Sequence, residues 1–162
     1  MTKDVDNRLS KASSAFGRLQ KRVWKNHSLR LSTKMQVYQA AVLSTLIYGS
    51  EAWVLYRKQT KRLEQFHQRC LRSIMGIKWK DYITNIEVLE RAQLQSIESM
   101  LILKQLRWAG HITRMPDTRM PKAVFYGELV QGKHNTGAPQ KRFKDQLKRQ
   151  LCQADINPKT WE

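Results

Sequence analysis

The chain has 162 residues, and its 30 Lys and Arg against 13 Asp and Glu give a formal net charge of +17. Its hydrophobic content of 41%, with five Trp and five Tyr, is enough for a folded core and argues against a disordered basic tail. A folded domain this basic is typical of proteins that meet polyphosphate, because each neutralised phosphate releases condensed counterions.

The sequence indicates an intracellular protein. Cys70 and Cys152 are too few for a disulfide scaffold and favour a reducing compartment. The opening MTKDVDNRLSKASS lacks the apolar core of a signal sequence. The longest uncharged run, 35–50, contains several polar residues, and a membrane span needs roughly 20 apolar ones. We therefore expect the cytoplasm or nucleus, with no membrane partner.

The first predicted element is an amphipathic helix. Its apolar residues recur at intervals of three and four: Leu9, Ala12, Phe16, Leu19 and Val23. Its other side carries Arg8, Lys11, Arg18, Lys21, Arg22 and Lys25. Asp4 or Asp6 is expected to cap its start. The Asp4-x-Asp6 pair is also compatible with a bound cation, but its place before a basic helix favours the cap.

The second predicted helix runs from about Thr33 to Tyr48. It is apolar on almost every side, so we expect it to be central and buried. Gly49 is a plausible stop, because glycine readily adopts the left-handed conformation that ends many helices.

The third predicted helix spans roughly Arg57 to Met75 and ends at Gly76. On a helical wheel one arc is apolar and holds Leu63, Phe66, Cys70, Leu71 and Ile74. The opposite arc is basic and holds Lys58, Lys61, Arg62, Arg69 and Arg72. His67 falls inside the apolar arc, beside Cys70.

The remaining elements are also helical. Thr84 and Glu87 have capping-box spacing for a short helix through Arg91, and a long apolar helix follows from Ser96 to about Ile112. Proline and glycine become frequent from Pro116, and 131–140 reads as a mobile loop. A last helix turns Phe143, Leu147 and Leu151 inward and Lys141, Arg142, Lys144, Lys148 and Arg149 outward.

The predicted fold is all-α, a thumb-like bundle of about five to seven helices. Residues 1–115 form its helical region, and 116–162 form a loop-rich connector with a basic amphipathic helix. No stretch shows the alternation of a strand.

No metal or catalytic constellation emerges from the sequence. Zinc needs about four ligands, usually as two close pairs, whereas His67 and Cys70 form a single pair on an apolar arc. A core histidine and a small buried thiol are the preferred interpretation. Cys70 also lacks a visible base to activate it, and no glycine-rich phosphate loop is present. We expect neither a metal nor another cofactor.

Positive charge interleaved with aromatic residues is the remaining functional signal. Three stretches carry it, within 57–72, 107–114 and 141–149, and each is able to contact phosphates. Such contacts position a nucleic acid without reading its sequence. A solvated helix face is the alternative for each stretch taken alone.

Long strings of the sequence resemble a known family. The string LSTLIYGSEAWVLYRKQTKRLEQFHQRCLRSIMGIKWKDYITNIEVLERA (43–92) is similar to the region after the polymerase core in RTE-type non-LTR (LINE-class) retrotransposon proteins. The resemblance continues through QLRWAGHITRMPDTRMPK, FYGEL and GAPQKRFKDQLK, and extends back to DVDNRLSKASSAFGRLQKRVW. It covers nearly the whole chain.

The resemblance implies part of an enzyme. Proteins of that family carry an endonuclease, then a reverse transcriptase (RNA-directed DNA polymerase) with fingers and palm, and this chain looks like the thumb-like and connecting region that follows. The palm's catalytic carboxylates, in a Tyr/Phe-x-Asp-Asp setting, are missing, as is the family's continuation beyond Trp161 and Glu162. We therefore expect a non-catalytic fragment of a transposable element.

By this resemblance the chain would hold template–primer RNA and DNA by the backbone, beside the upstream fingers and palm. The expected phosphate contacts are Arg57, Lys58, Lys61, Arg62, Arg69 and Arg72. A second group comprises Arg107, Arg114, Lys141, Arg142 and Lys144. Trp108 and His111 are candidates for base stacking, although Trp108 at its helical spacing is more often core. The alternatives are a domesticated basic interaction protein and a non-functional element remnant.

Overall fold

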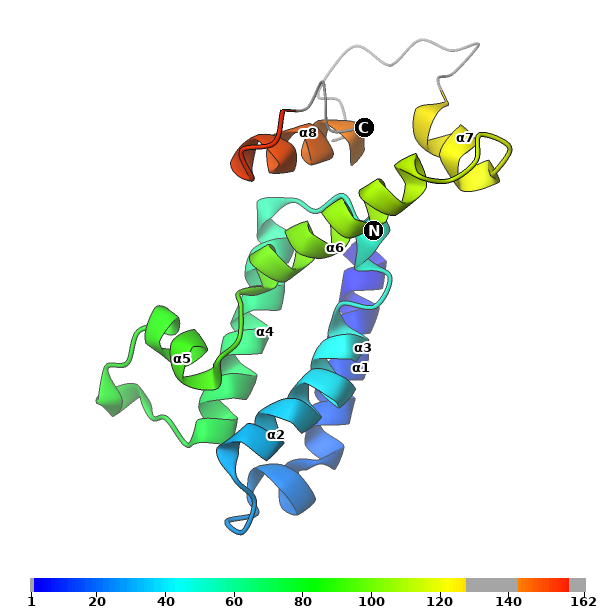
Figure 1. Cartoon of the computed structure of the whole chain (residues 1–162). Coiled ribbons are helices and arrows are strands. Elements are labelled where there is room, and N and C mark those ends of the chain that lie inside the picture. Colours follow the sequence, from blue (N-terminus) through cyan, green and yellow to red (C-terminus); the bar gives the residue numbers. More distant parts are fainter. Residues whose placement is uncertain (1, 128–142, 158–162) are drawn as a thin grey trace. The chain divides into compact units, whose positions relative to one another are not determined.

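The computed structural model describes residues 2–127 and 143–157, and these are helices joined by turns (Figure 1). The helices are α1 (Thr2–Arg18), α2 (Leu31–Val37), α3 (Ser44–Leu46), α4 (Arg57–Met75), α5 (Asn85–Ala92), α6 (Ile97–Thr113), α7 (Met120–Tyr126) and α8 (Phe143–Gln153). The described part contains no strand, so the all-α prediction is confirmed. The predicted loop at 131–140 lies outside the described residues, as do Lys141 and Arg142.

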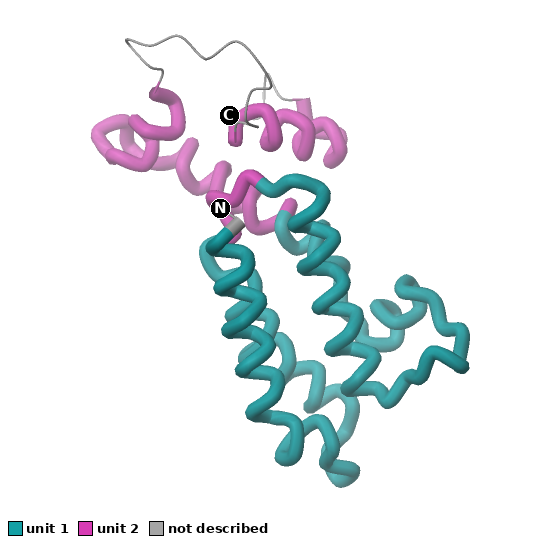
Figure 2. The backbone as a smooth tube through the Cα atoms, turned by 180° about the vertical axis from the view of Figure 1, so that it is seen from behind, with its two compact units in different colours: residues 1–49, 55–101 teal, residues 50–54, 102–162 magenta. Residues whose placement is uncertain are grey.

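The chain divides into two compact units (Figure 2). The first unit comprises residues 1–49 and 55–101, and the second comprises residues 50–54 and those from 102 onward. The boundary between them falls within α6. The separate connector expected from residue 116 onward stays a prediction.

The core of the first unit lies where α1 packs against the helical segment 38–46 and against α4. Side chains from all three are completely buried there: Val5, Tyr38, Val42, Leu46, Leu63 and Leu71. Burying one large apolar side chain contributes about 1.5–3 kcal/mol, so these side chains are a major source of the unit's stability. α4 also packs against the short helix α5.

Helix α4 has the bounds predicted from the sequence, Arg57–Met75. Gly76 ends it with a φ of +68°, in the left-handed region that glycine enters without steric cost. Leu63, Cys70, Leu71 and Ile74 of the apolar arc are buried. α5 likewise begins as predicted, because the Thr84 hydroxyl accepts the backbone N–H of Glu87.

The predicted N-cap of the first helix is wrong. α1 already begins at Thr2, so Asp4 lies in its first turn and Asp6 lies inside it. Asp4 pairs with Arg8 one turn on, at 3.7 Å, and Asp6 pairs with Arg62 of α4 at 2.6 Å. A carboxylate near the N-terminus of a helix is favoured by the macrodipole, and Asp6 has an additional partner that only the tertiary fold supplies.

The second predicted helix exists, but the expectation that it is central and buried is correct for one side only. Residues 31–46 form α2, a π-helical turn (Tyr38–Leu43) and α3 in one run, and Gly49 follows with a φ of +73°. One side carries buried residues such as Met35 and Leu46, whereas the other exposes Gln36, Gln39, Ala40 and Ser44. Packing covers one side of this run only.

The second unit contains a helix that the sequence reading missed. α7 spans a region rich in helix breakers, yet Pro121 sits in its first turn, where a missing N–H costs nothing. A Cβ at Gly127 would come within 2.7 Å of the Ala123 carbonyl oxygen, so the end of α7 requires glycine. The unit's core is an apolar cluster of Ala109, Ile112, Phe125, Leu147 and Leu151, with Leu106, Trp108, Tyr126 and Phe143 against it.

A buried glutamine joins three parts of the second unit. Gln105 is completely buried, and its Nε2 donates to the carbonyl of Trp53 at 2.7 Å. Its Oε1 accepts from Gln146 at 2.9 Å and from Gln150 at 2.5 Å, both on α8. Gln105 therefore connects the segment 50–54, α6 and α8.

Within the described residues, none of the helices has the length and apolarity that crossing a membrane demands.

Candidate nucleic-acid interface

The exposed side of α4 carries most of the residues predicted to contact phosphate. Arg57, Lys58, Lys61, Arg62 and Arg69 are all exposed, on the side opposite the buried arc. Among the described residues, the side chains of Lys58, Lys61 and Arg69 have no ion-pair or hydrogen-bond partner, so each is available to an incoming anion.

Glu64, the one acidic residue of α4, is occupied inside the protein. Its Oε2 accepts the backbone N–H of Ile97 at 2.8 Å, at the first turn of α6, and its Oε1 accepts from Gln68 at 3.3 Å. A carboxylate there satisfies an otherwise unpaired helix donor and opposes the positive end of the helix dipole. With Glu64 directed to that position, the exposed residues of α4 include basic and uncharged side chains but no acidic one.

Two of the predicted contacts have structural roles as well. Arg62 pairs with Asp6, and both side chains are nearly half exposed, so the pair contributes at most about 1 kcal/mol and can be exchanged for a phosphate. Arg72 is half-buried, and its Nη2 donates to the Ile83 carbonyl at 2.8 Å and to Asn85 Oδ1 at 2.9 Å. Arg72 thus braces the turn that follows α4.

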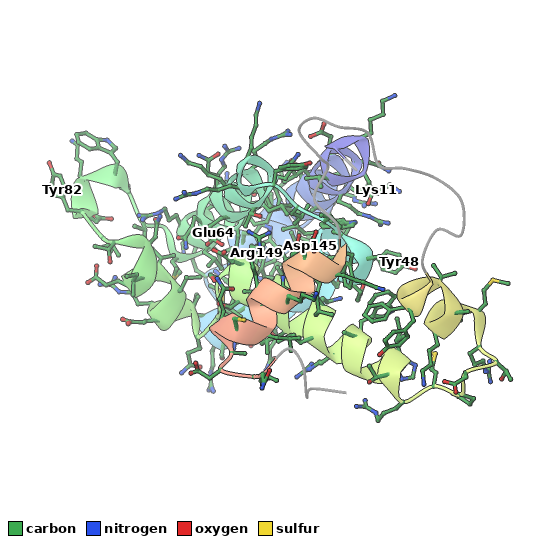
Figure 3. The ribbon with its side chains drawn as sticks, turned by 90° about the horizontal axis from the view of Figure 1, so that it is seen from above. Lys11, Tyr48, Glu64, Tyr82, Asp145 and Arg149 are labelled. Carbon is green, nitrogen blue, oxygen red and sulfur yellow. The ribbon has the colours of Figure 1, made fainter. Side chains whose placement is uncertain are left out.

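Helix α1 adds basic residues that were not among the predicted contacts. Because α1 packs against α4, exposed Lys3, Lys11 and Arg18 lie on the neighbouring helix. Figure 3 shows Lys11 extending from α1 on the side away from α5. The basic face of the first helix was visible in the sequence, but the packing of this helix against α4 was not.

His67 and Cys70 are both buried, as the core interpretation predicted. His67 Nδ1 lies 2.8 Å from the Tyr38 hydroxyl, and the two rings stack with centroids 5.7 Å apart. Burial lowers the pKa of His67, although Glu64 and the Gln95 backbone act in the opposite direction, so this imidazole is neutral at pH 7. Within the described residues, no group of three or more His, Cys, Asp or Glu side chains is arranged to hold a metal ion.

The two thiols are expected to differ strongly in reactivity. Burial raises the pKa of Cys70 to about 12, against weaker opposing effects of Arg69 and Tyr38, whereas Cys152 is exposed. Because the thiolate is the nucleophile, a disulfide reagent at pH 7.5 should modify one thiol per native chain rapidly and two after denaturation. In Cys152→Ser the rapid phase should disappear. Rapid modification of both thiols in the native chain would contradict the burial of Cys70.

The second group of predicted residues lies in the second unit. Arg107 and His111 are exposed on one face of α6, four residues apart, and exposed Arg114 lies in the turn directly after the helix ends at Thr113. Trp108 instead has its centroid 6.0 Å from that of Phe125 and 5.4 Å from that of Phe143, in nearly perpendicular pairs. Trp108 therefore has the core role that its spacing favoured.

Lys144 was predicted to face outward, and this is only partly correct. It is half-buried at the start of α8, where its Nζ donates to the Tyr126 carbonyl at 3.5 Å and lies 5.9 Å from the Tyr126 ring centroid. The long aliphatic stem of a lysine can pack while its ammonium remains wet, which explains the mixed environment.

Comparison with known proteins identifies a distant relative. The chain is 23% identical, over 128 residues, to a Caenorhabditis elegans protein described as transposon-derived and uncharacterized. The match covers 76% of this chain and 46% of that protein, so the chain spans about half the length of its relative. No protein-family model matches the chain. No solved structure matches it either.

Proposed function

We propose that the chain is a non-catalytic, thumb-like part of a retrotransposon reverse transcriptase, and that it holds template–primer nucleic acid by the phosphate backbone. The observation that carries the proposal is the two-sided character of α4. One arc of the helix packs into the core through Leu63, Leu71 and Ile74, and the other exposes Lys58, Lys61 and Arg69, none of which pairs with an acidic residue of the described part. The distant relation to a transposon-derived protein and the family resemblance of the sequence point the same way.

The dimensions of α4 suit a phosphate backbone. From Arg57 to Arg69 the helix rises about 18 Å at 1.5 Å per residue. A nucleic-acid strand presents about five phosphates over that length, at roughly 3.4 Å each. A rigid helix therefore offers several ammonium and guanidinium groups to consecutive phosphates. Such contacts fix position and orientation but carry no sequence information.

In this proposal the chain binds the nucleic acid, and the palm of the parent enzyme catalyses the polymerisation. The chain's own residues neutralise phosphates and keep the duplex against the helix. By itself the chain should not extend a primer on an RNA template with magnesium and nucleotides, and primer extension by the purified chain would refute this part of the proposal.

Binding to duplexes should depend strongly on salt and weakly on sequence. For about five neutralised phosphates, the logarithm of the affinity should fall with the logarithm of the salt concentration at a slope of roughly −4 to −5. Fluorescence anisotropy with two DNA duplexes of unrelated sequence and one RNA·DNA hybrid would measure it. Affinity that does not change with salt, or that differs strongly between the two DNA sequences, would contradict backbone binding.

A further inference from the structure

The turn between α4 and α5 holds two aromatic rings in solvent. Trp79 is 76% exposed and Tyr82 is 83% exposed. Their ring centroids are 6.5 Å apart and their planes lie at 74°. Figure 3 shows Tyr82 at the outer end of this turn, away from α4. Large apolar side chains gathered at one exposed point indicate a binding site more often than single exposed residues do.

The backbone of this turn is firmly held. At its start, the Lys78 N–H donates to Asp81 Oδ2 at 2.7 Å, and at its end Arg72 binds the carbonyl of Ile83 at 2.8 Å. Tyr82 has a φ of +49°, a left-handed conformation that is costly for a bulky residue and persists only where its surroundings enforce it. Hydrogen bonds therefore fix the backbone of the turn that exposes the two rings, although neither ring is part of the core.

The charge around the rings favours an anionic ligand. Lys78 and Lys80 flank Trp79, and Lys80 Nζ lies 6.0 Å from the Trp79 ring centroid. Asp81 is the one acidic residue of the turn, and its carboxylate is engaged by the Lys78 backbone. An exposed aromatic face beside free ammonium groups is the combination by which proteins bind single-stranded nucleic acid, with bases on the rings and phosphates on the cations.

We propose that Trp79 and Tyr82 stack an unpaired base of single-stranded nucleic acid, while Lys78 and Lys80 bind the adjacent phosphates. Because the two ring planes are nearly perpendicular, a base would lie on the face of one ring with the other ring at its edge. Paired bases inside a duplex offer no free face, so the ligand is a strand that extends beyond a duplex. The inference rests on the proposed function, in which α4 holds the duplex, and it adds a separate site for the unpaired strand.

The test compares two labelled DNA hairpins by anisotropy, one blunt and one with an unpaired oligothymidine extension at its 3′ end. The parent chain should prefer the extended hairpin by about tenfold or more, as expected for one stacked base. The double variant Trp79→Ala/Tyr82→Ala should lose this preference and bind the blunt hairpin as the parent does. The matched variant Trp79→Phe/Tyr82→Phe keeps two aromatic faces and should retain most of the preference.

The outcomes separate this inference from the proposed function. Equal affinity of the parent for the two hairpins would overturn the stacking site and leave backbone binding intact. A preference that survives in the alanine variant, or disappears in the phenylalanine variant, would also overturn it. Failure to bind either hairpin would overturn both proposals. Circular dichroism of each variant should match the parent, because neither ring contributes to the core.

Discussion

Replacing Lys58, Lys61 and Arg69 together with Gln should make the salt dependence of nucleic-acid binding much shallower. These three exposed side chains lie on α4 away from its buried arc, and each is expected to neutralise one phosphate. At about 0.9 per phosphate, the slope should fall in magnitude by roughly 2.7. Between 50 and 200 mM salt, the loss of affinity would then be about 40-fold smaller than for the parent chain.

The matched control removes the same charge elsewhere. Lys21, Lys25 and Arg119 are exposed and lie outside the three stretches that were predicted to contact phosphate. Changing these three to Gln lowers the net charge equally, so any general effect of charge appears in both triple variants. The slope of the control should stay close to that of the parent.

Both variants should remain helical, because Gln, Lys and Arg have similar helix propensities. Arg62 and Arg72 are left unchanged because they bond within the protein, and their loss would mix binding with stability. If the α4 variant is folded and its affinity has the same salt dependence as that of the parent, the exposed side of α4 is a solvated surface only. Nucleic-acid binding would then have to be sought elsewhere in the chain.

Replacing Gln105 with Leu should destabilise the second unit by about 2–4 kcal/mol. Gln105 is completely buried, and it donates to the Trp53 carbonyl and accepts from Gln146 and Gln150. Leucine has nearly the same volume but can make none of these bonds. Buried polar groups that lose such a partner each cost roughly 1–3 kcal/mol.

Urea unfolding followed by tryptophan fluorescence would measure this loss, since Trp53 and Trp108 both belong to the second unit. The control is Gln153→Leu, the same change at an exposed position of α8, which should alter stability by no more than about 0.5 kcal/mol. Equal stability of the two variants would mean that the Gln105 bonds are not formed. A reduced midpoint with an unchanged denaturant slope would confirm a loss of stability alone.

Local chemistry explains which elements were predictable. The bounds of α4 followed from a sustained period of 3.6 residues and a glycine at the point where the period stops. The start of α5 followed from the pairing of Thr84 with Glu87 across one turn. α7 was missed because a proline reads as a breaker unless one knows that it falls in the first turn of a helix.

By itself the sequence determined the helical class, the buried and basic arcs of α4 and the core role of His67 and Cys70, because each depends on spacing within one helix. The tertiary structure alone decided which partners these residues meet. It placed α1 beside α4, turned Glu64 toward the start of α6, committed Arg72 to the turn after α4 and left Trp79 and Tyr82 in solvent. A periodic pattern fixes the direction of a side chain about its own helix axis, but its neighbours depend on how distant segments pack.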